Sequence, residues 1–115
     1  MKISDIKDLL GAEVLCGTGS LDTEVQSACG SDMMSDVLAF VKDQAVLLTG
    51  LVNSQVIRTA MMMDMVCVVF VRSKQPSAEM LSLAEDGGLV ILSTEKRMYE
   101  ACGILYSNGL GNRLG

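Results

Sequence analysis

The 115-residue sequence contains no histidine and no tryptophan. Without histidine, the chain cannot build a Ser-His-Asp or Cys-His catalytic group, a histidine-ligated metal site or a histidine pH switch. Aromatic side chains are also scarce, with only Phe40, Phe70, Tyr99 and Tyr106. Any catalytic chemistry would therefore depend on carboxylates, lysine, hydroxyl groups, thiols or backbone dipoles.

Long apolar runs and extended basic clusters are missing as well. The longest apolar run, residues 65–71, has the length of a strand and is far short of the ~20 residues that a membrane helix needs. Met1-Lys2 leads into a polar helical start rather than a signal peptide, so we expect a cytoplasmic protein without membrane contact. The net charge of −5 repels the phosphate backbone of a nucleic acid. The densest basic groups are only Arg72-Ser73-Lys74 and Lys96-Arg97. We therefore expect no nucleic-acid binding.

Closely spaced cysteine pairs do not occur. The four cysteines form no C-x-x-C motif, and Cys67 and Cys102 lie within apolar patterns, typical of small core residues. Metal sites usually show paired ligands at short spacing. The sequence therefore predicts no metal site and no cofactor.

Half of the residues are apolar, and nine of them are methionine. A chain of this composition and length can bury a core of its own without disulfides or metals. We predict a single domain over residues 1–109 and a flexible, glycine-rich C-terminal tail over residues 110–115.

A strand–helix repeat dominates the second half of the chain. Apolar strands are predicted at residues 45–48, 67–71 and 89–92, and a helical pattern follows each of them. Upstream, we expect a helix at 4–10, a strand at 13–16, an alternating strand within 21–29 and a helix after residue 32. Successive βα units of this length predict right-handed crossovers and a mainly parallel sheet. The predicted fold class is α/β, a three-layer α/β/α arrangement.

Two of the predicted helices carry further signals. Asn53 is placed to cap the helix that contains Met61-Met62-Met63. Neighbouring helix positions lie about 100° apart, so one of these three methionines must face away from the core. The last helix carries its apolar residues at Met98, Tyr99, Ala101, Cys102 and Leu105.

Each strand of the repeat ends near a small hydroxyl residue, at Thr49, Ser73 and Ser93. The carboxyl ends of parallel strands share one edge of a sheet, so this edge should collect these residues together with Gly50 and Thr94. Helix N-termini and free backbone N–H groups there favour anions. We predict a ligand site at this edge. The alternative is that each hydroxyl only caps a helix.

The order of these segments resembles a DRTGG domain, whose fold is similar to the N-terminal domain of HPr kinase/phosphatase. The likeness covers most of residues 1–109 and is carried by Ile3-Ser4-Asp5-Ile6, Leu21-Asp22, Gly30-Ser31-Asp32, Leu47-Leu48-Thr49-Gly50 and residues 67–71, 89–94 and 98–109. The aspartate of the signature is Asp32, Met33 stands at the arginine position, and Thr-Gly-Gly becomes Thr49-Gly50-Leu51. The guanidinium that could clamp a phosphate is therefore missing from the signature itself.

The resemblance implies a regulatory or binding module that forms homodimers. In fused relatives such as regulated pyrophosphatases, other domains carry the chemistry. We predict a non-catalytic ligand-sensing module that binds a nucleotide or a small phosphorylated metabolite, with Asp32, Thr49, Gly50 and Asn53 among the contacting residues. One alternative is a homodimeric scaffold without a small-molecule ligand. A third hypothesis is an enzyme with Asp32 as base and Thr49 as nucleophile.

Overall fold

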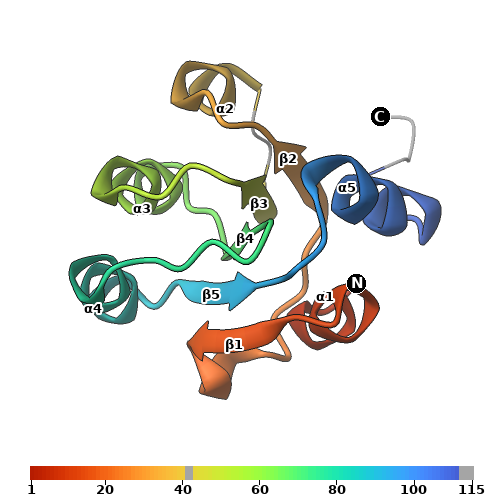
Figure 1. Cartoon of the computed structure of the whole chain (residues 1–115), viewed down its shortest axis with the longest axis horizontal. Helices are drawn as coiled ribbons and strands as arrows, with labels where there is room; N and C mark the ends of the chain where they lie inside the picture. The colour runs from red at the N-terminus through yellow and green to blue at the C-terminus, as the bar shows by residue number, and fades with distance from the viewer. Residues whose placement is uncertain (41–42, 112–115) are drawn as a thin grey trace.

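The computed structural model describes residues 1–40 and 43–111. Its strands and helices alternate along the chain, as the repeat predicts (Figure 1). The elements in chain order are α1 (Ile3–Leu10), β1 (Glu13–Cys16), the 3-10 helix η1 (Thr18–Ser20), β2 (Ser27–Gly30), α2 (Met34–Phe40), β3 (Ala45–Thr49), α3 (Ser54–Met62), β4 (Cys67–Phe70), α4 (Ala78–Gly87), β5 (Val90–Ser93) and α5 (Met98–Ser107). The tail predicted at 110–115 falls largely on residues 112–115, which lie outside the described residues.

The strands of the described residues form one sheet in the order β1-β5-β4-β3-β2. The strands from β2 to β5 run parallel to their neighbours, and β1 pairs antiparallel with β5. Gly30 lies opposite Leu48, Thr49 opposite Phe70, and Phe70 opposite Ser93. The carboxyl ends of the four parallel strands therefore share one edge, and the predicted α/β fold with a mainly parallel sheet is confirmed.

Helices cover both faces of the sheet (Figure 1). The helices α2, α3 and α4 lie on one face, and α1 and α5 lie on the other. Successive strand residues alternate between the two cores: Leu48 packs on the α1/α5 side, and Leu47 on the α2–α4 side. Every residue of β3 and β4 is buried, which explains why their sequences are apolar apart from Thr49 at the end of β3. This is the predicted three-layer arrangement.

The segment before β2 differs from its predicted form. Alternation across residues 21–29 predicted one strand, but only Ser27–Gly30 joins the sheet. Upstream of it, Glu24 forms an antiparallel bridge with Lys2, and the Val25 N–H donates to the Met1 carbonyl at 2.7 Å. The alternating pattern thus belongs to two pairings, one with the start of the chain and one with β3.

The prediction for the methionine triplet is confirmed. Met62 is 64% exposed, whereas Met61 packs against α4 so closely that a Cβ at Gly87 would overlap its sulfur. Among the described residues, no helix combines the length and the apolar character needed to cross a membrane.

Candidate functional site

A hydrogen-bonded corner joins the end of β2 to the end of β3. The Ser31 N–H donates to the Leu48 carbonyl at 3.0 Å and so carries Asp32 past the end of β3. One carboxylate oxygen of Asp32, Oδ1, accepts from the Thr49 hydroxyl at 3.0 Å and from the Gly50 N–H at 2.7 Å. The structure thus brings three predicted site residues together. It also shows that the Thr49 hydroxyl and the Gly50 N–H already have a partner in Asp32.

Asn53 lies at the same edge and begins α3. Its side-chain Oδ1 accepts from the Val56 N–H at 3.2 Å, which is an N-cap interaction. The predicted cap is confirmed, and this oxygen is already occupied by the helix.

The other predicted hydroxyl residues, Ser73, Ser93 and Thr94, lie at the β4–α4 and β5–α5 loops. They bond to neighbouring segments, and their hydroxyls do not cap a helix. The Ser73 N–H donates to the Thr94 carbonyl at 2.8 Å. The Ser93 hydroxyl donates to the Lys74 carbonyl at 3.1 Å and accepts from the Gln75 side chain at 3.3 Å. The buried Thr94 hydroxyl donates to a carbonyl of α1 at 2.7 Å and accepts from a backbone N–H of its own loop at 3.2 Å. These bonds hold the β4–α4 loop against the β5–α5 loop.

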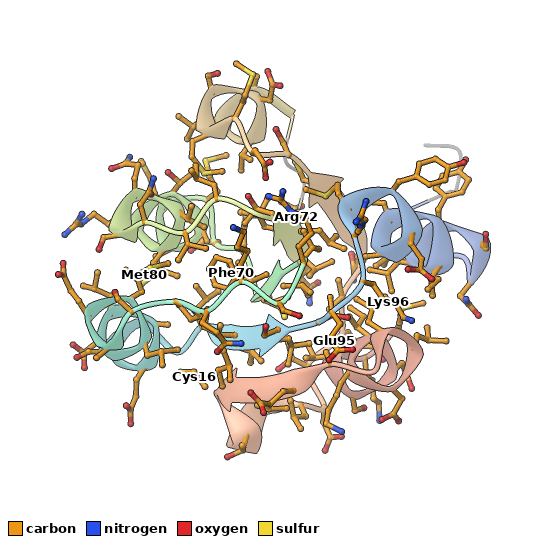
Figure 2. The ribbon with its side chains drawn as sticks, in the orientation of Figure 1. Cys16, Phe70, Arg72, Met80, Glu95 and Lys96 are labelled. Carbon is orange, nitrogen blue, oxygen red and sulfur yellow. The ribbon has the colours of Figure 1, made fainter. Side chains whose placement is uncertain are left out.

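Sequence reasoning missed Arg72, which the same pair of loops positions. The Arg72 N–H donates to the Lys96 carbonyl at 2.8 Å, and Arg72 and Ser73 both adopt the left-handed conformation, with φ of 58° and 57°. The Arg72 guanidinium lies so close to Gly50 that a Cβ there would overlap it. Arg72 is labelled in Figure 2, near β3. Within residues 1–40 and 43–111, this guanidinium makes no hydrogen bond or ion pair. The glycine of the Thr-Gly turn therefore makes room for a cation from the loop after the neighbouring strand.

Basic residues gather in these two loops. Of the nine lysines and arginines in this acidic chain, the loops after β4 and β5 hold Arg72, Lys74, Lys96 and Arg97. Lys96 reaches Glu100 at 4.0 Å, whereas the other three form no ion pair in the part of the chain that the structure describes. The sequence contained a signal for this cluster, because each basic group begins within four residues of the end of a predicted strand and these strands end at the same edge.

The ionisable groups with resolved pKa shifts are the four thiols. Burial raises the pKa of Cys102, and the nearby Cys29 raises it further. Burial also raises the pKa of Cys16, with a smaller contribution from the Glu85 carboxylate. These shifts disfavour the thiolate, which is the nucleophilic and metal-binding form. Among the described residues, no cluster of three or more Cys, Asp or Glu side chains is arranged to hold a metal ion.

Two comparisons with known proteins agree with this fold. A crystal structure of the CBS and DRTGG domains of the regulatory region of Clostridium perfringens pyrophosphatase, complexed with its activator diadenosine tetraphosphate, superposes with a TM-score of 0.78. The match has 14% sequence identity and covers 90% of this chain but only 45% of that one. No curated protein matches the sequence. The family model described as "DRTGG domain" matches residues 5–107, nearly the whole described chain. The chain therefore belongs to the DRTGG domain family.

Proposed function

We propose that this chain is a non-catalytic ligand-sensing module that binds a nucleotide or a small phosphorylated metabolite at the carboxyl edge of its sheet. The observation that carries the proposal is the Arg72 guanidinium, which lies over Gly50 without an ion-pair partner among the described residues. A guanidinium presents paired N–H donors that match phosphate oxygens, and it keeps its charge at any physiological pH.

The position of Arg72 supports a role in binding. A non-glycine residue in the left-handed conformation costs roughly 1–2 kcal/mol, and such strain is typically retained at functional sites. Met33 occupies the arginine position of the family signature, and its side chain is 61% exposed. Arg72 therefore brings to the Thr49-Gly50 turn a guanidinium that the signature lacks. It does so from the loop after β4 instead of from the start of α2.

Charge supports the same site. The loops after β4 and β5 hold four cations, Arg72, Lys74, Lys96 and Arg97, against one carboxylate, Glu95. Even with Asp32 beside them, this edge is locally basic in a protein with a net charge of −5, so an anion is drawn to it more than to the rest of the surface. Asp32 then has a positioning role, since its carboxylate fixes the turn over which Arg72 lies. Its second carboxylate oxygen is left to orient a polar group of the ligand.

The regulatory setting rests on the structural likeness. The matched pyrophosphatase region is complexed with a dinucleotide activator, and it contains CBS domains in addition to its DRTGG domain. This chain spans less than half of that region. Nucleotide binding by this chain is therefore proposed from its own carboxyl edge, and the likeness supports only the general class of function.

Thermal unfolding with a panel of phosphorylated compounds tests the proposal. A true ligand at 100 times its Kd adds about 2.7 kcal/mol to the free energy of unfolding. Arg72→Ala should abolish this gain. Arg58→Ala, which removes the same charge from the exposed side of α3, should leave it intact. An absence of stabilisation across nucleotides, sugar phosphates and pyrophosphate would contradict the proposal, and so would a ligand whose effect survives Arg72→Ala.

Self-association is the second candidate function, as a homodimeric scaffold. In the part of the chain whose side chains the structure describes, five large apolar side chains are exposed. Four of them lie at the start of α2, on α2 or on α5: Met33, Leu38, Tyr99 and Tyr106. These two helices flank β2, the edge strand of the sheet (Figure 1). An edge strand beside exposed apolar groups is a surface on which another chain can pair. Sedimentation would refute this candidate if the protein stays monomeric at micromolar concentration.

A further inference from the structure

A groove runs between α5 and the edge strand β2. It has a volume of about 780 Å³, within the range of pockets that hold small ligands. Its lining is mainly apolar and includes Leu48, Cys102, Leu105 and Leu110. The groove lies on the face of the sheet that α1 and α5 cover, and it shares Leu48 with the Asp32 corner, where the Leu48 carbonyl accepts from the Ser31 N–H.

Two glycines shape this groove. A Cβ at Gly30 would lie 2.6 Å from the Cys102 sulfur, so only glycine lets α5 pack this close to β2. Gly103 lies inside α5, lines the groove, and has no atom within 4 Å of the position that a Cβ would take. Glycine inside a helix is destabilising relative to alanine. No close contact requires a glycine at position 103. The absence of a side chain there leaves the groove open.

The groove reaches the carboxyl edge of the sheet. Gly30 and Leu48 lie opposite each other and line its wall, and Asp32 and Gly50 each follow two residues later. At ~3.3 Å per residue, Gly50 and the guanidinium above it lie about 7 Å beyond this part of the wall. Tyr99, in the first turn of α5, is at the same end and is 93% exposed.

We propose that the groove receives the flat ring of the ligand whose phosphates bind at the carboxyl edge, so that the ligand is a nucleotide. This inference rests on the proposed function, because the basic edge supplies the phosphate contacts. Apolar walls beside an exposed tyrosine suit a base, which stacks on aromatic rings. A separation of about 7 Å, two residues of extended chain, leaves room for one sugar between ring and phosphate. The acidic group of the lining, Glu100, is paired with Lys96 at 4.0 Å.

Calorimetric titration with ADP, adenosine and pyrophosphate tests the groove separately from the edge. ADP should bind the wild-type protein about tenfold more tightly than pyrophosphate, the effect of one stacked base. Tyr99→Ala and Gly103→Leu should remove this advantage and leave pyrophosphate affinity unchanged. Gly19→Leu, at an equally open glycine of η1, controls for a new exposed leucine. Gly103→Leu should also raise the unfolding temperature, because leucine favours a helix more than glycine does.

Three other outcomes would contradict the groove inference, and they differ in what they imply for the edge site. Equal affinity for ADP and pyrophosphate, unaffected by Gly103→Leu, overturns the groove inference and leaves the edge site standing. Failure of both compounds to bind overturns the proposed function together with the inference. If Tyr99→Ala and Gly103→Leu change the sedimentation coefficient but not ADP affinity, the groove is a self-association surface and the inference is wrong.

Discussion

Replacing Asp32 with alanine should destabilise the protein through two lost hydrogen bonds. Its carboxylate accepts from the Thr49 hydroxyl at 3.0 Å and from the Gly50 N–H at 2.7 Å. A hydrogen bond to a charged group contributes about 1.5–3 kcal/mol. Asp32 is exposed, so the lower figure applies to each bond, and water can partly replace the carboxylate at Gly50. We expect a loss of roughly 2–3 kcal/mol for Asp32→Ala.

Urea unfolding followed by circular dichroism measures this loss. Asp32→Asn retains an oxygen acceptor without the charge, and it should cost only about 1 kcal/mol. Asp22→Ala removes an exposed carboxylate that makes no hydrogen bond in the described residues, and it should stay within about 0.5 kcal/mol of the wild type. The melting temperature of Asp32→Ala should fall by about 10 °C. If Asp32→Ala and Asp22→Ala have the same unfolding midpoint, the corner is not held by these bonds.

Three further predictions concern strain, burial and alkaline pH. Arg72→Gly should raise the unfolding free energy by about 1 kcal/mol while abolishing ligand binding, whereas Asp64→Gly, which relieves another left-handed residue, should raise stability with binding intact. Phe70→Ala, at a fully buried ring, should cost about 3–5 kcal/mol in urea unfolding. Complete burial raises the Cys67 pKa above its ordinary value of 9.0, so the native state retains this proton more tightly than the unfolded state. The resulting stability is fully present below pH 9.0 and is lost as pH rises further, and Cys67→Ala should flatten this alkaline decline. A decline unchanged by Cys67→Ala would contradict the last prediction.

The fold was largely predictable because each element carries its own local signal. Buried parallel strands give unbroken apolar runs, and the cap at Asn53 is a short-range signal. The antiparallel direction of β1 has no such signal, because β1 pairs with β5, which is distant in the sequence. The start of β2 was misplaced because a pairing with a distant segment again left no local signal. Glu24 fits the alternating pattern of the β2 residues, but it pairs with Lys2 and not with β3.

The candidate site was only partly predictable. Thr49 and Gly50 could be placed at this edge from the strand–helix repeat, and Asp32 from the resemblance to the DRTGG domain; the three residues do meet there. The position of Arg72 beside Gly50 could not be predicted. It depends on the hydrogen bond from the Arg72 N–H to the Lys96 carbonyl, which joins two loops that are distant in the sequence. Tyr99 was counted with the apolar pattern of its helix, yet it is 93% exposed.

The most direct test of the central claim is a titration of isotope-labelled protein with ADP, followed by backbone amide NMR. If the carboxyl edge binds phosphate, the largest shift changes should occur at the amides of Gly50, Arg72 and Ser73, and they should disappear in Arg72→Ala. Shift changes that avoid these three amides, or that persist unchanged in Arg72→Ala, would contradict the assignment of ligand binding to this edge.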